Sequence, residues 1–300
     1  MYKNPTDIID SIHSDELVYS KHDKKCAPGI TFENGSCYSL NVLVEMANEY
    51  NKNNSSDIIQ LFPNFETLNR SKYKQYLVKQ FKKRLSDVCD SQKCWTTHIF
   101  IKKMNKLQTE ELQKNIFRPS GPQGNFEWLN TININDVMKQ YETKYSDFSW
   151  IGAVPIDFDD LAQLKIKSLD FDELCRNNKT KIGIIFNLDE SWKSGSHWVA
   201  SFANLKEGQV YFFDSYGTPP EHRIRTYMRR VSIYCKDILK TNIDANHNKI
   251  RHQYGGSECG VYSINFILRL LRGDSFKDIC ASKIPDKKIN KCRKVYFNRI

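Results

Sequence analysis

The sequence has no stretch that approaches the ~20 consecutive apolar residues a membrane-spanning helix needs. Its first residues, MYKNPTDIIDSIHSDEL, contain no continuous apolar segment and do not resemble a secretory signal peptide. Internal repeats and low-complexity tracts are also missing, which argues against repeat architectures. We therefore expect a soluble globular protein that is not secreted through a signal peptide.

Regularly spaced cysteines are missing too. The nine cysteines are odd in number and irregularly spaced, which does not indicate a disulfide scaffold and suits a reducing cytosol. Cys26 with Cys37, and Cys89 with Cys94, bracket short loops and leave a structural zinc site as an alternative. Neither pair has the Cys-x2-Cys spacing of common zinc modules, so we expect buried free thiols. We expect packing roles for the cysteines without a partner pattern, Cys175, Cys235, Cys280 and Cys292.

Acidic residues are fewer than basic ones, 35 against 45, and the formal charge is +10. Two segments concentrate the excess: residues 70–84 hold seven Lys or Arg and no acid, and residues 282–300 hold seven against the single Asp286. Each segment is interpreted either as a solvated face or as a docking surface for nucleic acid or an acidic partner. The sequence leaves both interpretations open.

The chain of 300 residues, with 40% hydrophobic and 12% aromatic residues, is long enough for a catalytic domain plus an accessory one. A Pro/Gly/Ser cluster near residues 119–125 is the candidate linker. We predict an N-terminal accessory region, mostly helical, over residues 1–115 and a catalytic domain over residues 116–300. In the first region, Ser39–Tyr50 has the periodicity of an amphipathic helix.

Strand and helix patterns alternate in the second region. Ile182–Phe186 is a continuous apolar run typical of a central strand. His197–Phe202 and Val210–Phe213 flank a Lys-Glu-Gly turn and predict a hairpin. We also expect helices capped by Asn133 or Asn135 and over residues 221–239, and a short strand over residues 248–252. The pattern predicts an α+β fold.

Cys259 precedes a glycine and a dense apolar run, so the sequence predicts a buried helix that starts at this cysteine. The unpaired N–H groups and the dipole of a helix N-terminus favour a thiolate over a thiol. Gln253, six residues upstream, carries an amide that can donate to an oxyanion. The competing interpretation is a buried structural cysteine.

His197 opens the first hairpin strand and Asp214 follows the second. In an antiparallel hairpin the start of one strand lies beside the end of the next, so the two side chains are expected to be neighbours. A histidine with a carboxylate behind it is an oriented general base. His252 adjoins Gln253, but on a strand its side chain is expected to face the opposite way. His222 lies in a basic helical stretch and is expected to face solvent. Asn204 is a weaker candidate for the orienting group because it lies at the turn.

The order His-Trp, then Asp, then Gln-x5-Cys-Gly resembles the adenovirus-protease and SUMO-protease superfamily of cysteine peptidases. Trp128-Leu129 resembles the Trp-Leu pair that opens the catalytic domain in the SUMO-protease branch. The segments FRPSGPQGNFEWLNT, IGAVPIDF and CAPGITFENGSCYS resemble polyprotein-processing proteases of large cytoplasmic DNA viruses, such as the African swine fever virus and mimivirus-like enzymes. The resemblance implies a mixed sheet flanked by helices.

The resemblance also implies a function. It assigns catalytic roles to His197, Asp214, Gln253 and Cys259, and makes Trp198 the roof of a channel for a Gly-Gly sequence before the scissile bond. We expect an endopeptidase that processes viral core polyproteins in the host cytoplasm and virion, with no metal or other cofactor. DNA activates the adenovirus branch, but no motif indicates it here. Trp150 and Trp192 are expected in the core.

Three alternatives stay open at the level of sequence. The same site can remove SUMO or a similar modifier, using another docking surface. It can also transfer acyl groups without hydrolysis, as in bacterial acetyltransferase effectors that share the His-acid-Cys order. A catalytically inactive binding module is the third alternative, which the intact quartet of residues disfavours.

Overall fold

The structure is a computed structural model that describes residues 19–62, 68–98, 115–124 and 126–298. The N-terminal segment expected not to be a signal peptide, and the last two residues of the basic segment 282–300, lie outside these ranges. Contacts divide the chain into two compact units, residues 1–119 and residues 120–300, and each is described by itself. Among the described residues, no helix is both long and apolar enough to cross a bilayer.

Three helices of the first unit lie wholly within the described residues: α2 (Leu40–Asn53), α3 (Arg70–Leu85) and α4 (Gln92–Trp95). Ser39 caps α2 by accepting a hydrogen bond from the Val42 backbone, which confirms the predicted amphipathic helix. The helices enclose an aromatic core in which Tyr38 stacks on Trp95. This region is helical, as predicted.

Part of the basic segment 70–84 belongs to this core and is not a solvated face. The Lys74 side chain is buried and donates to the Ser36 carbonyl. Lys82 pairs with the buried Asp23, and Arg84 pairs with Asp57. Several basic side chains of this segment therefore make contacts within the protein and are less available to bind nucleic acid or an acidic partner.

Four of the nine cysteines form disulfides in the structure, so the expected free thiols at these positions are a wrong prediction. Cys26 joins Cys37 and Cys89 joins Cys94, with Cα separations of 5.4 and 5.5 Å. Each loop between the cysteines folds back and brings the two Cα atoms within the usual bridging range. No group of three metal-ligating side chains occurs among the residues that the structure describes.

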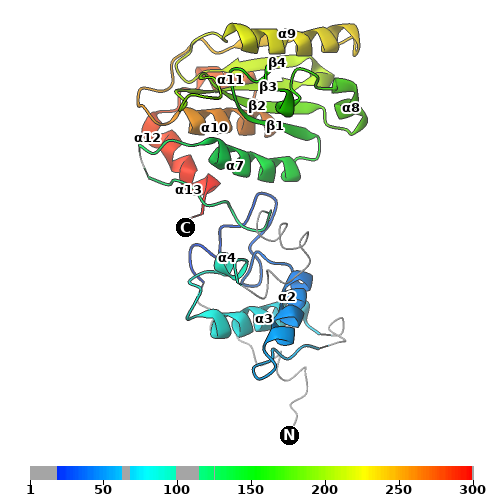
Figure 1. The fold of residues 1–300 in the computed structure, drawn as a ribbon, viewed down its shortest axis with the longest axis vertical. Helices are drawn as coiled ribbons and strands as arrows, with labels where there is room; N and C mark the ends of the chain where they lie inside the picture. The colour runs from blue at the N-terminus through cyan, green and yellow to red at the C-terminus, as the bar shows by residue number, and fades with distance from the viewer. Residues whose placement is uncertain (1–18, 63–67, 99–114, 125, 299–300) are drawn as a thin grey trace. The chain divides into compact units, whose positions relative to one another are not determined.

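The second unit is built on a five-stranded mixed sheet (Figure 1). The spatial order is β1 (Phe148–Pro155), β2 (Lys181–Asn187), β3 (Trp198–Asn204), β4 (Gln209–Phe213) and β5 (Asp244–His247). β1 runs parallel to β2 and β4 parallel to β5, while β3 is antiparallel to both of its neighbours. The ends of β1, β2, β4 and β5 and the start of β3 therefore lie at the same edge.

Helices cover both faces of this sheet (Figure 1). α7 (Thr131–Lys144) and α10 (Cys259–Leu271) share one apolar core, and α9 (His222–Asp237) packs into another on the opposite face. Short helices complete the unit: α8 (Phe171–Arg176), α11 (Phe276–Ala281), α12 (Asp286–Ile289), α13 (Arg293–Tyr296), and the 3₁₀ turns η3 (Ala162–Leu164), η4 (Leu205–Glu207) and η5 (Asn290–Cys292). The predicted fold class is confirmed.

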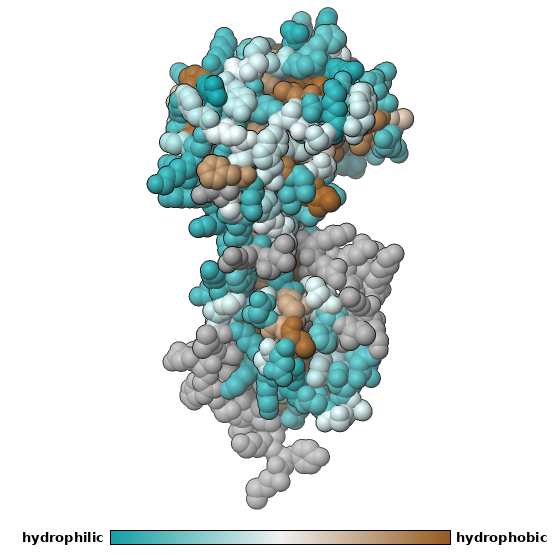
Figure 2. All heavy atoms as spheres, turned by 60° about the vertical axis from the view of Figure 1, so that its left-hand side comes forward, coloured by the Kyte–Doolittle hydropathy of each residue, from teal (hydrophilic) through white to brown (hydrophobic). Residues whose placement is uncertain are grey.

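Hydrophilic side chains predominate on the face of the second unit in Figure 2, where hydrophobic ones gather in small groups. Most large apolar side chains lie in the two cores. Trp150 is buried, as expected, but Trp192 is 74% exposed. The core prediction for Trp192 is wrong because it follows β2 in a loop and not in a strand.

Two local predictions also differ from the structure. Asn130, and not Asn133 or Asn135, caps α7, and the Asn133 side-chain oxygen accepts a hydrogen bond from the Asn130 backbone N–H. The predicted strand over residues 248–252 is irregular, and the strand β5 ends before it. Residues 248–254 instead make side-chain and backbone contacts that hold the site described next.

Candidate active site

Cys259 is the first residue of α10 and its side chain is buried, with 2% exposure. The structure thus confirms a helix that begins at this cysteine, where the first N–H groups have no intrahelical acceptor. The next residue, Gly260, lies in a position with little room for a side chain. A Cβ there would lie 3.1 Å from the Leu129 Cβ and 3.4 Å from the Trp198 indole. The glycine lets α10 approach these side chains closely.

His197 and Asp214 are neighbours across the β3–β4 hairpin. The His197 Nε2 atom lies 2.6 Å from an Asp214 carboxylate oxygen, and both side chains are largely buried. The same carboxylate accepts hydrogen bonds from the Tyr216 and Thr218 backbone N–H groups. Asp214 is therefore fixed, and the Nδ1 atom of His197 remains for a reacting group.

The surroundings of His197 favour its protonated form. Burial lowers the pKa of the imidazole, but hydrogen bonds to Asp214 and Cys259 outweigh it and raise the pKa to about 9. Burial raises the pKa of Asp214, and the His197 contact together with the Tyr216 N–H lowers it below its usual value. This electrostatic arrangement can hold an imidazolium beside a thiolate and a carboxylate.

Gln253 is fully buried on the loop between β5 and α10. Its side-chain oxygen accepts from the Ser215 hydroxyl at 2.6 Å, and its Nε2 donates to the Gly255 carbonyl at 2.8 Å. The Ser215 carbonyl accepts from the His252 and Gln253 backbone N–H groups. An amide nitrogen carries two hydrogens, so Gln253 keeps a second donor for an oxyanion.

Asn248 and Asp286 hold the two loops of the site. Asn248 bonds both the N–H and the carbonyl of Asp214. Asp286 accepts from the Tyr254 and Gly255 N–H groups at 2.9 and 2.7 Å. The structure therefore connects the residues after β4, the residues before α10 and the start of α12.

A buried polar cluster lies directly before Cys259. Glu258 is 1% exposed and accepts from Asn290 at 2.8 Å. Arg293 is completely buried, donates to the Asn290 side chain and donates to the Ser257 carbonyl at 2.9 Å. Part of the basic segment 282–300 is therefore packed beneath the site and is not a solvated tail.

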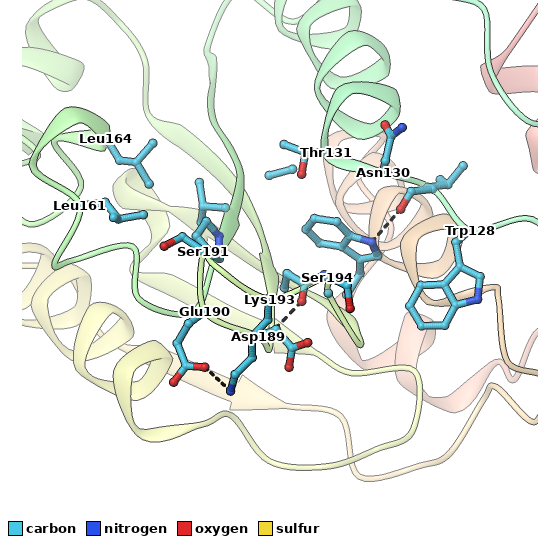
Figure 3. Close-up of a pocket in the computed structure, with 17 residues that line it drawn as sticks. Trp128, Asn130, Thr131, Leu161, Leu164, Asp189, Glu190, Ser191, Lys193 and Ser194 are labelled. Atoms are coloured by element: carbon cyan, nitrogen blue, oxygen red, sulfur yellow. Dashed lines mark hydrogen bonds and ion pairs between the residues drawn. The ribbon is translucent and has the colours of Figure 1, made fainter.

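A pocket of about 450 Å³ opens beside Trp198 (Figure 3). The ends of β1 and β2 and the segment before β3 line it, with Leu161 and Leu164 on one side and Trp128 on the other. Glu190 and Lys193 form an ion pair at its rim, 2.5 Å apart. The Trp198 indole donates to the Leu129 carbonyl at 2.8 Å, which fixes the indole between the pocket and α10.

The predicted site residues thus occupy one edge of the sheet, at the start of β3, the end of β4 and the start of α10. The His252 ring lies 3.1 Å from the Cys280 carbonyl oxygen. His222 is exposed, as expected. Asn204 ends β3, at the opposite end of that strand from His197.

Sequence reasoning missed four residues that hold the site: Tyr216, Asn248, Asp286 and Arg293. Tyr216 follows Asp214 closely and stacks on the His197 ring, so the FDSY segment could have drawn attention to it. The other three gave no signal, because their contacts join segments distant in the sequence.

Comparison with known families matches residues 176–300 to the Ulp1 protease family, C-terminal catalytic domain. The chain is similar to a putative thiol protease of Acanthamoeba polyphaga mimivirus, with 36% identity over 271 residues. That alignment spans 88% of this chain and 90% of the relative.

More distant relatives agree with this match. The SUMO-1 cysteine protease of African swine fever virus is 25% identical over 260 residues, spanning 81% of this chain and 95% of the relative. A crystal structure of the African swine fever virus protease has the same fold, with a TM-score of 0.66 and 22% identity. The superposition covers 95% of this chain and 99% of that one.

Proposed function

The chain belongs to the Ulp1 protease family and is a cysteine protease, and from this premise we propose that it is a viral endopeptidase that cleaves structural polyproteins after Gly-Gly-type sequences. The observation that carries the proposal is the contact of His197 with both Asp214 and Cys259 beside the pocket at Trp198. The similarity to the mimivirus and African swine fever virus proteins supports a viral source.

In the proposed mechanism the Cys259 thiolate attacks the carbonyl carbon of the scissile peptide bond. His197 holds the thiolate as an ion pair and then protonates the leaving amine. Asp214 keeps the imidazole oriented through its Nε2 atom. Gln253 and the Cys259 backbone N–H stabilise the oxyanion, and water, deprotonated by His197, hydrolyses the thioester.

The Gly-Gly preference rests on the close packing around Trp198. The indole is held by the Leu129 carbonyl and approaches Gly260 at the start of α10. A substrate backbone can pass close to this indole toward Cys259 only at residues that have no Cβ. Glycine is the only such residue. The pocket in Figure 3 continues from Trp198 and gives the preceding substrate residues an apolar wall at Leu161 and Leu164.

A second candidate function is removal of SUMO or a similar modifier. It is favoured by the similarity to the SUMO-1 cysteine protease of African swine fever virus. The relatives from both viruses extend over most of this chain and so include the first unit. We propose that this unit is an accessory domain and that residues 120–300 are catalytic.

Docking on nucleic acid or a viral core shell through segments 70–84 and 282–300, and action in the host cytoplasm and virion, are further parts of the proposal. The internal contacts of Lys74, Arg84 and Arg293 reduce the charge available for docking. Salt-dependent retention on DNA is the measurement for this part, since phosphate contacts weaken steeply with ionic strength.

The test of the proposed function is turnover of two substrates in parallel. One is a peptide with a Gly-Gly-Xaa sequence and the other is SUMO with a C-terminal reporter. We expect peptide cleavage between Gly and Xaa, little cleavage of SUMO, and neither product with the Cys259→Ala variant.

Each other outcome has a defined meaning. Preferred cleavage of SUMO would replace the polyprotein proposal with the deconjugating function. Cleavage that survives Cys259→Ala would remove Cys259 from the mechanism. As a control, Cys175→Ala changes a cysteine outside the site and should leave turnover unchanged.

A further inference from the structure

Two tyrosines and two cations form a stacked series that starts at His197. We call this set, Tyr216, Arg251, Tyr254 and Lys283, the tyrosine–cation surface. The Tyr216 ring stacks on the His197 ring, with centroids 4.5 Å apart and planes 10° from parallel. The Arg251 guanidinium lies 4.9 Å from the centroids of both tyrosine rings. Lys283 continues the series, 4.3 Å from the Tyr254 ring and 2.6 Å from its hydroxyl.

This surface is exposed and carries positive charge. Tyr254 is 63% exposed and Tyr216 is 36% exposed, and both cationic residues face solvent. Neither Arg251 nor Lys283 pairs with a carboxylate among the described residues. The nearby carboxylate of Asp286 is occupied by backbone N–H groups and the Tyr262 hydroxyl. The exposed cations are thus available to a negatively charged partner.

The position of the surface follows from the strand order. The pocket at Trp198 lies at the ends of β1 and β2. The tyrosine–cation surface is formed by segments that follow β4, β5 and α11. His197 and Asp214 lie between them, at the start of β3 and the end of β4. A substrate chain that crosses the catalytic residues therefore has the pocket on one side and the tyrosine–cation surface on the other.

We propose that the tyrosine–cation surface binds the substrate segment on the C-terminal side of the scissile bond and selects acidic residues in it. The inference rests on the proposed function, which assigns the Trp198 side to the segment before the scissile bond. Aromatic rings supply contact area at low entropic cost, and the cations attract carboxylates. The Arg251 Nε donates to the Gln253 carbonyl, and a guanidinium retains further N–H donors for a carboxylate.

The experiment uses two peptides that share one Gly-Gly sequence and differ only after the scissile bond. One carries Asp and Glu there, and the other carries Asn and Gln. The dissociation constants of both are measured on the full-length Cys259→Ala protein, which binds without cleaving. We expect the acidic peptide to bind about 3- to 10-fold more tightly at low salt, with a smaller ratio at high salt because surface charges are screened.

Lys283→Glu is the diagnostic substitution, because Arg251 also holds the loop of Gln253. We expect it to bring the ratio of the two dissociation constants to about one or below. Lys236→Glu, on α9, makes the same charge change at another exposed position and should preserve the ratio. A general effect of the substitution on folding or affinity changes both dissociation constants alike, so it cancels in their ratio.

Equal affinity for the two peptides, or a ratio that Lys283→Glu leaves unchanged, would overturn the inference. Failure of the proposed function has a different signature. If the wild-type protein cleaves neither peptide but the Cys259→Ala protein still prefers the acidic one and Lys283→Glu removes that preference, the Gly-Gly proposal fails and the selection of acidic residues by this surface stands.

Discussion

Asp286, at the start of α12, accepts a hydrogen bond from the backbone N–H of Gly255 at 2.7 Å. The carbonyl of the same glycine accepts from the Gln253 side chain. The two contacts lie on adjacent peptide groups of one loop, so the Asp286 side-chain carboxylate sets the position of the amide proposed to stabilise the oxyanion. Asp286 is in this sense a positioning residue.

We predict that Asp286→Ala lowers kcat by about 10-fold to 10²-fold while KM changes little, because a misplaced donor weakens transition-state binding more than substrate binding. Asp286→Asn, which keeps one acceptor oxygen, should recover part of the rate. Steady-state kinetics on the Gly-Gly peptide measure both effects. Asp274→Asn, at an exposed carboxylate paired with Arg269, is the matched control, and an equal loss there would contradict the prediction.

The pH dependence of activity should follow His197. The pKa of its imidazole is raised from 6.5 to about 9, so the protonated ring required by the proposed mechanism persists above neutral pH. We expect kcat/KM to fall on the alkaline side near pH 9 and not near pH 6.5. A descending limb near pH 6.5 would show that Asp214 and Cys259 do not stabilise the protonated ring.

The same shift has a consequence for folding stability. Because the pKa in the folded protein lies above the ordinary value, the contribution of His197 is fully present below about pH 6.5 and is lost as the pH rises through about 9. Urea unfolding across this range should show stability decreasing with pH. The decrease should be smaller in His197→Gln, and an identical slope in both proteins would count against the assignment.

Gly183 in β2 supports the site through packing. A Cβ at this position would lie 2.7 Å from the Phe148 ring and 3.3 Å from the Ile267 side chain of α10. We expect Gly183→Ala to lower the free energy of unfolding by about 1–3 kcal/mol, the usual cost of overpacking a core. Gly256→Ala, where a Cβ meets nothing within 4 Å, should change it by much less in the same denaturant titration.

The disulfides of the first unit are expected to stabilise it. Replacing Cys26 and Cys37 together by serine should lower the unfolding free energy of that unit by about 2–4 kcal/mol, since the bridge restricts the unfolded chain. Cys175→Ser, at a free cysteine, is the control. Titration of the denatured, unreduced protein should find five free thiols, and nine would show that neither bridge forms.

Local sequence signals predicted much of the second unit. β-rich and apolar runs indicated β2, β3 and β4, and the glycine before a long apolar run placed Cys259 at the start of α10. These predictions succeeded because each depends only on the hydrophobic pattern or the capping residues of one short contiguous segment. The hairpin made His197 and Asp214 neighbours for the same reason.

Where two local signals competed, the sequence was less decisive. Asn130, Asn133 and Asn135 are all able to cap a helix, and the reciprocal bonds between Asn130 and Asn133 decided the start of α7. Trp192 was expected in the core because large aromatics usually are, but its loop leaves the side chain in solvent. The paired cysteines were expected to be free thiols. Their spacing in the sequence does not show whether the loop between them folds back and brings the two sulfur atoms together.

The sequence by itself indicated which residues we propose to carry the chemistry and fixed the order in which they occur, because the types His, Asp, Gln and Cys and their local settings are read along the chain. Only the tertiary structure decided how they are held. Asp286, Arg293 and the Arg251 between two tyrosines act through contacts that cross several elements. Such contacts depend on strand order and on how the C-terminal helices pack beneath α10, and no short sequence pattern encodes either.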